Sequence, residues 1–327
     1  MSLLTVENLT LQFDTDEGRI TAVENVSFAI NAGEVLGLVG ESGSGKSVTA
    51  KSLMQLNPEN SVYSPESNIQ LELESGTVDV LSLKKSQEMV VVRGGAISMI
   101  FQEPMSSLNP VLTIGQQISE ALILHQGMTK AEALARSVEM LDLVRIPEPA
   151  QRVREYPHQL SGGMRQRAMI AMALSCNPKL LIADEPTTAL DVTIQSQVLQ
   201  LLRQLKQEAG LTVLLITHDL GVVAELCDRV AVMYLGHIVE VAPAEDLYSH
   251  PLHPYTQALL SAVPIPDPAI EANRKRIILK GEVPSPLNPP SGCVFHPRCP
   301  IADASCESAV PELIEISPEH WVACFKA

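Results

Sequence analysis

The feature that most constrains this chain is a glycine-rich loop between an apolar strand and a helix. Residues 40–47 have the sequence Gly-Glu-Ser-Gly-Ser-Gly-Lys-Ser, after the apolar run Glu34–Val39 and before a helical pattern at Lys46–Leu56. Glycines let backbone N–H groups approach phosphate oxygens, and the helix N-terminus adds partial positive charge. A chance Gly-Ser turn is the alternative, and the flanking strand and helix argue against it. The sequence therefore predicts a nucleotide phosphate-binding loop.

Within this loop, Lys46 is predicted to reach the β- and γ-phosphates, and the Ser47 hydroxyl is predicted to bind Mg²⁺. The residues predicted to bind ATP here are Gly40, Glu41, Ser42, Gly43, Ser44, Gly45, Lys46 and Ser47.

Two other polar motifs lie next to apolar segments: one directly after a strand and one directly before a helix. The strand Leu180–Ala183 delivers Asp184, predicted to help hold Mg²⁺, and Glu185, predicted to be the general base for the attacking water. An apolar run ending in Asp-Glu is also typical of an ordinary strand terminus. Ser161-Gly162-Gly163 precedes a helical pattern and predicts a second anion site, although an ordinary capped helix start has the same residues.

The order of elements predicts a mainly parallel sheet whose functional loops lie at its carboxyl edge. The first 35 residues alternate apolar and polar positions and predict a β-meander. Buried strands then alternate with helices, and a hairpin with Gly236 in its turn closes the pattern. Strands are expected at 9–13, 22–30, 69–73, 78–83, 97–101, 211–216, 230–233 and 237–240, and helices at 113–143 with a break near Gly127, at 161–174 and at 192–209.

Charge and hydropathy exclude several classes of protein. The chain has 38 acidic and 23 basic residues and a net charge of −15, which argues against a nucleic-acid-binding face. No apolar run approaches the roughly 18 residues that span a bilayer. The N-terminus lacks the pattern of a signal peptide, so a cytoplasmic chain is expected that docks onto other proteins if it works at a membrane.

Taken together, these motifs resemble the nucleotide-binding subunits of ABC transporters over about residues 3–241. That family has a phosphate loop, a glutamine, a signature loop, an Asp-Glu pair and a histidine in this order. The resemblance assigns the glutamine to Gln102, the signature to Leu160–Met164 and the histidine to His218. Met164 stands where glutamine is commoner.

The resemblance implies a mechanism in which ATP lies between two subunits arranged head to tail. Glu185, His218 and Gln102 are the implied catalytic residues, with Ser47, Gln102 and Asp184 at Mg²⁺. A capping or core role is the alternative for His218. The implied signature residues facing the partner's ATP are Ser161, Gly162, Gly163 and Gln166, with Asp191 in the D-loop. Phe13 is the best match for the residue that stacks on adenine, and Ile20 is the second candidate.

Composition changes after about residue 241, where prolines become dense. The stretches at 250–256, 281–286 and 292–300, with the run at 102–110, resemble the dipeptide/oligopeptide importer class of ABC subunits. A dipeptide importer ATPase is the first choice, and nickel, glutathione and longer-peptide systems share these features. The expected domains are a nucleotide-binding domain at 1–240, with a helical subdomain at about 103–166, and a Pro-rich extension at 241–327.

Four cysteines of this extension follow the pattern C-x5-C-x6-C-x17-C: Cys293, Cys299, Cys306 and Cys324. Four thiolates suit an iron–sulfur cluster or structural zinc, and four unliganded thiols are the third alternative. The lack of short C-x2–4-C pairs and the resemblance to this importer class favour [4Fe–4S]. His296 and His253 are alternative ligands. The predicted fold is thus α/β: a P-loop ABC ATPase core with an N-terminal antiparallel β-subdomain, an inserted helical subdomain and a small irregular C-terminal Cys-cluster module.

The implied function is an ATP-hydrolysing motor that drives peptide uptake through other subunits. Its implied partners are a second, related ABC ATPase in a heterodimer, two transmembrane permease subunits and, indirectly, an extracytoplasmic peptide-binding protein, at the cytoplasmic face of the inner membrane. A soluble ABC ATPase of DNA repair or translation, an exporter half and a regulatory module without turnover are the alternatives. A soluble ABC ATPase of DNA repair or translation is expected to have paired cassettes or a basic surface, and an exporter half is expected to have a membrane segment. This sequence shows none of these features, and the intact Glu185 disfavours a regulatory module without turnover.

Overall fold

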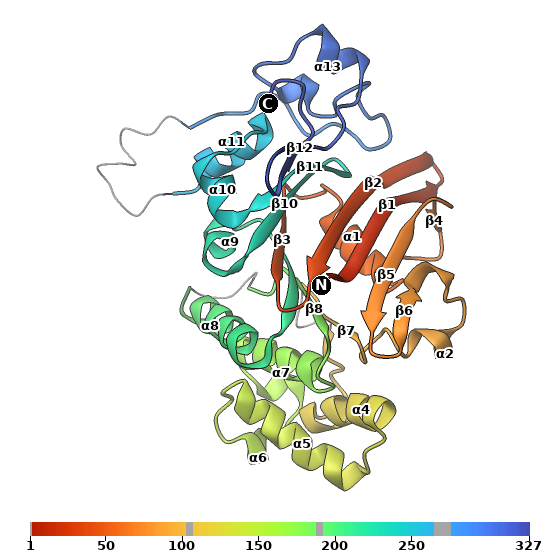
Figure 1. Cartoon of the computed structure of the whole chain (residues 1–327). Coiled ribbons are helices and arrows are strands. Elements are labelled where there is room, and N and C mark those ends of the chain that lie inside the picture. Colours follow the sequence, from red (N-terminus) through yellow and green to blue (C-terminus); the bar gives the residue numbers. More distant parts are fainter. Residues whose placement is uncertain (1, 103–106, 188–191, 265–275) are drawn as a thin grey trace. The chain divides into compact units, whose positions relative to one another are not determined.

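A computed structural model describes residues 2–102, 107–187, 192–264 and 276–327 of the chain (Figure 1). The chain divides into two compact units. Unit 1 is formed by residues 1–3, 31–34 and 72–216, and unit 2 by residues 4–30, 35–71 and 217–327. Each unit therefore combines segments that are distant in the sequence, and each is described by itself.

Unit 1 contains three parallel strands in the order β9-β8-β7. Their bounds are Ile97–Ile100 for β7, Leu180–Asp184 for β8 and Thr212–Thr217 for β9. Every residue of these strands is buried. This explains their continuous apolar sequences, because a parallel strand is covered on both faces.

The helices of unit 1 begin at residues that favour helix starts. Thr113 and Thr129 each form a capping box, which satisfies N–H groups at the first turns of α4 and α5. Gly127 ends α4 in the left-handed conformation, at a φ of 65°. The helices of this unit are α2 (Ser86–Met89), α4 (Ile114–Gln126), α5 (Lys130–Leu143), α6 (Pro149–Arg152), α7 (Gly162–Leu174) and α8 (Val192–Ala209).

Two short segments complete unit 1. β6 (Gly76–Asp79) leads into a 3-10 helix at Val80–Ser82, and another 3-10 helix covers Pro157–Gln159. The Asp79 side chain accepts a hydrogen bond from the Leu81 N–H at 3.1 Å. This local bond turns the backbone away from a strand, so the strand expected at 78–83 is wrong beyond Asp79.

Unit 2 begins with an antiparallel sheet. β1 (Ser2–Thr15) lies between β2 (Gly18–Asn31) and β5 (Asn68–Leu73), and it also pairs with β4 (Ser61–Tyr63). β4 and β5 are antiparallel to β1. The expected N-terminal antiparallel β-subdomain is thus present, with its first two strands longer than predicted.

The rest of unit 2 contains strands in the order β12-β13-β11-β10-β3. β3 is parallel to β10, and the remaining pairs are antiparallel. The strands are β3 (Val35–Val39), β10 (Arg229–Tyr234), β11 (His237–Pro243), β12 (Ile314–Ser317) and β13 (His320–Val322), and the helices are α1 (Lys46–Ser52), α9 (Leu220–Leu226), α10 (Ala244–Ser249), α11 (Pro254–Ala262) and α13 (Ala304–Ser308), with a 3-10 helix at His296–Arg298.

A buried carboxylate joins three segments of unit 2. Glu240 in β11 is fully buried, and it accepts hydrogen bonds from the Leu252 and His253 N–H groups at 2.8 and 2.9 Å. His320 Nε2 in β13 lies 2.8 Å from the same carboxylate. These bonds anchor both the start of α11 and the C-terminal strands to β11, because a buried carboxylate needs partners for its oxygens.

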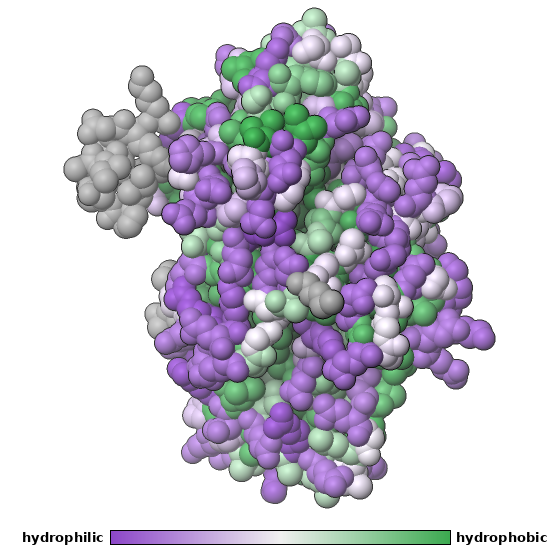
Figure 2. All heavy atoms as spheres, viewed as in Figure 1, coloured by the Kyte–Doolittle hydropathy of each residue, from purple (hydrophilic) through white to green (hydrophobic). Residues whose placement is uncertain are grey.

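One face of the molecule is mainly polar. Figure 2 shows mostly hydrophilic side chains on this face, in keeping with the net charge of −15, and apolar side chains gather over the C-terminal segment. Exposed apolar residues of that segment include Ile301, Val310, Ile314 and Ile316. Among the described residues, none of the helices has the length and hydropathy that crossing a membrane requires.

Candidate nucleotide-binding site

The phosphate loop of unit 2 follows β3 and is built on glycines in conformations that other residues avoid. Gly40, Gly43 and Gly45 have φ values of 150°, 78° and 102°. A Cβ atom on Gly40 would lie 2.1 Å from the Met233 carbonyl oxygen, and one on Gly45 would lie 2.7 Å from the Ala22 carbonyl oxygen. The loop therefore packs directly against neighbouring backbone and has room only for glycine at these two positions.

Lys46, the first residue of α1, turns its side chain back into the loop. Its Nζ donates hydrogen bonds to the Gly40 and Glu41 carbonyl oxygens at 2.8 Å each and to Ser44 Oγ at 3.1 Å. The residue is only 6% exposed. A buried ammonium held by neutral oxygens inside a glycine cradle fits a phosphate ligand, whose charged oxygens bind an ammonium more strongly. Ser47, predicted to bind Mg²⁺, follows as the half-buried second residue of α1.

The carboxylate pair of unit 1 lies at the end of β8. Asp184 is 4% exposed, and Glu185 follows with a φ of 47°, which is uncommon for a residue other than glycine. The Glu185 N–H donates to the Ile216 carbonyl oxygen at 2.8 Å. Gln102 Nε2 donates to Glu185 Oε2, also at 2.8 Å. The structure therefore brings together two of the three predicted catalytic residues, and the strained backbone at Glu185 is typical of functional sites.

The predicted signature loop forms the start of α7 in unit 1. Ser161 is the N-cap, and its Oγ accepts a hydrogen bond from the Met164 N–H at 3.3 Å. Gly162 and Gly163 form the first turn. Gln166 is buried, and its Nε2 donates to the Pro186 carbonyl oxygen at 2.6 Å. Sequence reasoning missed this link between α7 and the segment after Glu185, because nothing in the spacing indicates it.

His218 of unit 2 stands between β9 and α9 and is exposed. The cap of α9 is Asp219, which accepts hydrogen bonds from the Gly221 and Val222 N–H groups at 2.8 and 3.4 Å. The imidazole is therefore neither a core group nor the helix cap. The contact of His218 with a phosphate stays a prediction.

The remaining predicted residues are placed as follows. Phe13 is half-buried in β1, in register with Ser61 of β4, and Ile20 is half-buried in β2. Both belong to unit 2, as does the phosphate loop. The predicted D-loop residue Asp191 lies outside the described residues.

Two family profiles match the chain. The ABC transporter profile matches residues 23–188, and the profile of the oligopeptide/dipeptide transporter C-terminal region matches residues 239–306. The chain belongs to the ABC transporter family. The predicted family and the P-loop ABC ATPase core are therefore confirmed.

Relatives of this ABC ATPase match along almost the whole chain. It is 52% identical to the oligopeptide transport ATP-binding protein AppD of Bacillus subtilis, over 99% of this chain and 96% of that protein. It is 49% identical to the oligopeptide transport ATP-binding protein OppD of Escherichia coli, over 99% of this chain and 93% of the relative.

Solved structures match the cassette. A dimeric structure of the ATP-binding cassette MJ0796 in a post-hydrolysis state, bound to ADP and Pi, is 30% identical, with a TM-score of 0.64 over 74% of this chain and 98% of that one. The CbiO1 structure from Clostridium perfringens, part of an ABC transporter complex, is 26% identical, with a TM-score of 0.62 over 76% and 91%.

The structure of this ABC ATPase contradicts the predicted iron–sulfur site. Among the described residues, which include all four C-terminal cysteines, no group of three or more His, Cys, Asp or Glu side chains is placed to hold a metal ion. The same finding leaves the zinc alternative and the ligands His253 and His296 without support. The prediction of a C-terminal Cys-cluster module is therefore also wrong.

The contacts of the four cysteines give a physical reason. Burial raises the pKa values of the Cys293 and Cys299 thiols. The Cys306 thiol lies 3.6 Å from Asp303 Oδ1, and Cys324 Sγ accepts a hydrogen bond from the Lys326 N–H at 3.4 Å. Cys293 and Cys299 pack against the apolar cluster of unit 2, which contains the buried side chain of Phe295. Cys293 and Cys299 therefore contribute to the apolar packing of the C-terminal segment.

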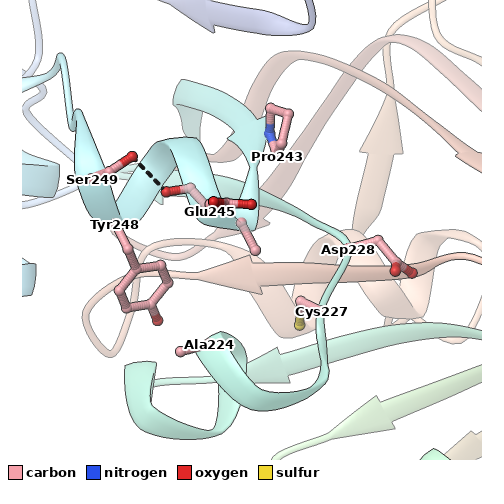
Figure 3. Close-up of a pocket in the computed structure, with 8 residues that line it drawn as sticks. Ala224, Cys227, Asp228, Pro243, Glu245, Tyr248 and Ser249 are labelled. Carbon is pink, nitrogen blue, oxygen red and sulfur yellow. Dashed lines mark hydrogen bonds between the residues drawn. The ribbon is translucent and has the colours of Figure 1, made fainter.

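A pocket of about 740 Å³ lies between α9 and α10 of unit 2 (Figure 3). The described residues that line it are Ala224, Cys227, Asp228, Pro243, Ala244, Glu245, Tyr248 and Ser249. Asp228 Oδ2 accepts a hydrogen bond from the Val35 N–H at 2.8 Å, so this carboxylate supports the start of β3. No predicted nucleotide-binding residue lines this pocket, so it is a separate feature from the phosphate loop.

Proposed function

We propose that this chain is the ATP-hydrolysing subunit of an importer for oligopeptides. The observation that carries the proposal is the match along 99% of the chain to proteins named for oligopeptide transport, including a match to the C-terminal region profile of that class. A cassette alone would indicate only an ABC ATPase. The match of residues 239–306 to the oligopeptide/dipeptide transporter C-terminal region restricts the proposal to peptide importers among the ABC ATPases.

The residues that hold the nucleotide follow from the loop chemistry. Lys46 and the backbone of the phosphate loop would bind the β- and γ-phosphates, and Ser47, Asp184 and Gln102 would hold Mg²⁺. When bound, Mg²⁺ neutralises charge on the phosphates. Phe13 stacks on the adenine. An ammonium suits the phosphate oxygens, and a hydroxyl and a carboxylate are oxygen ligands that suit Mg²⁺.

Hydrolysis then depends on Glu185, which accepts a proton from the attacking water as general base. Gln102 orients this carboxylate, a role supported by the 2.8 Å hydrogen bond between them. His218 contacts the γ-phosphate. The signature residues Ser161, Gly162, Gly163 and Gln166 and the D-loop residue Asp191 face the ATP of a partner subunit, so one chain supplies half of each site.

The partners and location follow from the same proposal. A second, related ABC ATPase completes the site as a heterodimer, and two transmembrane permease subunits supply the pathway. An extracytoplasmic peptide-binding protein delivers the substrate. The chain acts at the cytoplasmic face of the inner membrane through residues 1–240, and residues 241–327 form an extension to this ATPase domain.

Purification from cells with the chain at its natural level tests the proposal. We expect recovery with two integral-membrane subunits and a second ATPase, identified by mass spectrometry. As a control, the same purification in high salt and detergent identifies weakly adhering proteins. Recovery with DNA or ribosomes, and without membrane subunits, would contradict the importer function and support the soluble ABC class.

A further inference from the structure

The C-terminal segment of unit 2, which comprises residues 241–264 and 276–327 of the described chain, makes an ion pair with the phosphate loop. Arg298, at the end of the 3-10 helix His296–Arg298, donates to both carboxylate oxygens of Glu41. The distances are 2.6 Å from Nη1 to Oε2 and 3.2 Å from Nη2 to Oε1. Glu41 is the second residue of the phosphate loop, 257 positions earlier in the sequence. This bidentate geometry fixes the direction of the glutamate as well as its distance.

A second contact from the same part of the chain binds the backbone of Glu41. The Tyr255 hydroxyl in α11 accepts a hydrogen bond from the Glu41 N–H at 2.8 Å. The Glu41 carbonyl oxygen accepts hydrogen bonds from Lys46 Nζ at 2.8 Å and from the Ser44 N–H at 3.2 Å. Side chain, amide and carbonyl of Glu41 are therefore all bound, and one bond reaches the lysine that is proposed to bind phosphate.

The groups that hold Glu41 are themselves fixed by packing. The rings of Tyr234, Tyr255 and Phe295 contact one another, with centroid distances of 4.7, 5.2 and 5.4 Å. All three side chains are fully buried. The Arg298 guanidinium lies 5.8 Å from the centroid of the Tyr234 ring. Such aromatic contacts and the adjacent cation limit the motion of Arg298 and Tyr255.

The burial of the ion pair distinguishes it from ordinary surface pairs. The Arg298 side chain is 8% exposed and the Glu41 side chain is 32% exposed. The carboxylate of Glu41 raises the pKa of Arg298 above its ordinary value, so the arginine stays charged. Exposed pairs often contribute little, whereas a shielded pair that loses one partner leaves a costly charge.

We infer that Arg298 is a positioning residue for nucleotide binding: with Tyr255, it holds Glu41 so that the phosphate loop keeps its binding conformation. These two contacts thereby contribute to the ATP affinity of the loop. A loop held in its bound conformation loses less conformational entropy when the ligand binds. This inference rests on the proposed function, because it assigns positioning residues to the same ATP site.

The test measures the binding of a fluorescent ATP analogue, with Mg²⁺, to the full chain. We expect Arg298→Gln to weaken binding about tenfold, which corresponds to about 1.4 kcal/mol. Glu41→Gln removes the same pair from the loop side and should weaken binding by a similar factor. The double variant should show no further loss, because both changes break one interaction. Arg298→Lys keeps the charge without the planar fork and should restore part of the affinity.

Lys326→Gln is the matched control, since it breaks the ion pair between Lys326 and Asp303 in the C-terminal segment without touching the phosphate loop. It should keep the wild-type affinity. Folding of each variant is checked by circular dichroism, and if Arg298→Gln fails to fold, Glu41→Gln decides the question. Wild-type affinity in a folded Glu41→Gln or Arg298→Gln variant, or equal losses in Lys326→Gln, would overturn the inference. Failure of the wild-type chain to bind the analogue would instead contradict the proposed function.

Discussion

The phosphate loop and the segment that carries Glu185 are held in place in different ways. In the phosphate loop, Gly40 and Gly45 fit so closely against carbonyl oxygens that a Cβ atom has no room. At Glu185, a residue with a side chain adopts a φ of 47°, at a cost of roughly 1–2 kcal/mol. Its carboxylate contacts an exposed glutamine, Gln102, at 2.8 Å.

This difference assigns nucleotide binding to the phosphate loop and hydrolysis to the segment that carries Glu185. The phosphate loop is fixed by backbone packing and by contacts from the C-terminal segment, which suits a site that must bind the nucleotide in one conformation. The Glu185 carboxylate accepts a hydrogen bond from the exposed side chain of Gln102. Binding and hydrolysis should therefore respond separately to substitutions in the two regions.

The largest expected effect is on hydrolysis. Glu185→Gln should lower the ATPase rate of the assembled complex by about 10²–10⁴-fold, because an amide cannot accept the proton from water. ATP affinity, measured by titration with a fluorescent analogue, should stay at the wild-type value. Glu208→Gln is the matched control, because Glu208 is another exposed carboxylate that accepts a glutamine N–H, from Gln204 at 3.0 Å. Equal rates for wild type and Glu185→Gln would mean that another group is the base.

The next effect concerns the glycines of the phosphate loop. Gly40→Ala should cost about 3 kcal/mol or more, since its Cβ would lie 2.1 Å from the Met233 carbonyl oxygen. Gly43 also has a positive φ, but a Cβ there meets nothing within 4 Å, so Gly43→Ala should cost only about 1–2 kcal/mol. Thermal unfolding and ATP titration of both variants measure this contrast. If the two alanines were equally harmful, strain at φ rather than close packing would dominate the loop.

A smaller effect should appear on acidification of unit 2. His253 is 1% exposed, and burial lowers its pKa to about 4. Its Nδ1 accepts the Tyr255 N–H at 3.0 Å, and the Glu240 carboxylate, which also contacts His320, accepts the His253 N–H. The neutral imidazole thus supports the tyrosine that contacts the phosphate loop.

The direction in which the unfolding free energy changes with pH follows from the different pKa of His253 in the folded and unfolded chain. The unfolded chain takes up a proton on this histidine near its ordinary pKa of 6.5, and the folded chain does so only near 4. The contribution to the unfolding free energy is complete above pH 6.5 and falls as the pH drops to 4, by up to about 3 kcal/mol. Urea unfolding at several pH values measures it. His253→Asn keeps an acceptor for the Tyr255 N–H and should flatten this dependence, whereas an unchanged slope would assign it to another group.

The sequence predicted those parts of the molecule whose signals are local. The helix 192–209 and the phosphate loop appear where the apolar spacing and the glycines placed them. The segment 78–83 did not, because a side-chain hydrogen bond from Asp79 competes with the strand. The cysteine spacing suggested a metal site, although spacing alone does not fix where thiols point. The Arg298–Glu41 pair has no sequence signal, because its partners are 257 positions apart.

The most direct test of the proposed importer function is peptide-stimulated ATP hydrolysis by the complete complex in lipid vesicles. The complex contains this chain, its partner ATPase, the permease subunits and the peptide-binding protein. We predict that oligopeptides stimulate hydrolysis and enter the vesicles, and that Glu185→Gln in this chain lowers hydrolysis by about 10²–10⁴-fold, and uptake with it, while ATP still binds. Hydrolysis and uptake at the wild-type rate in the Glu185→Gln complex, or no response to any oligopeptide, would contradict the account.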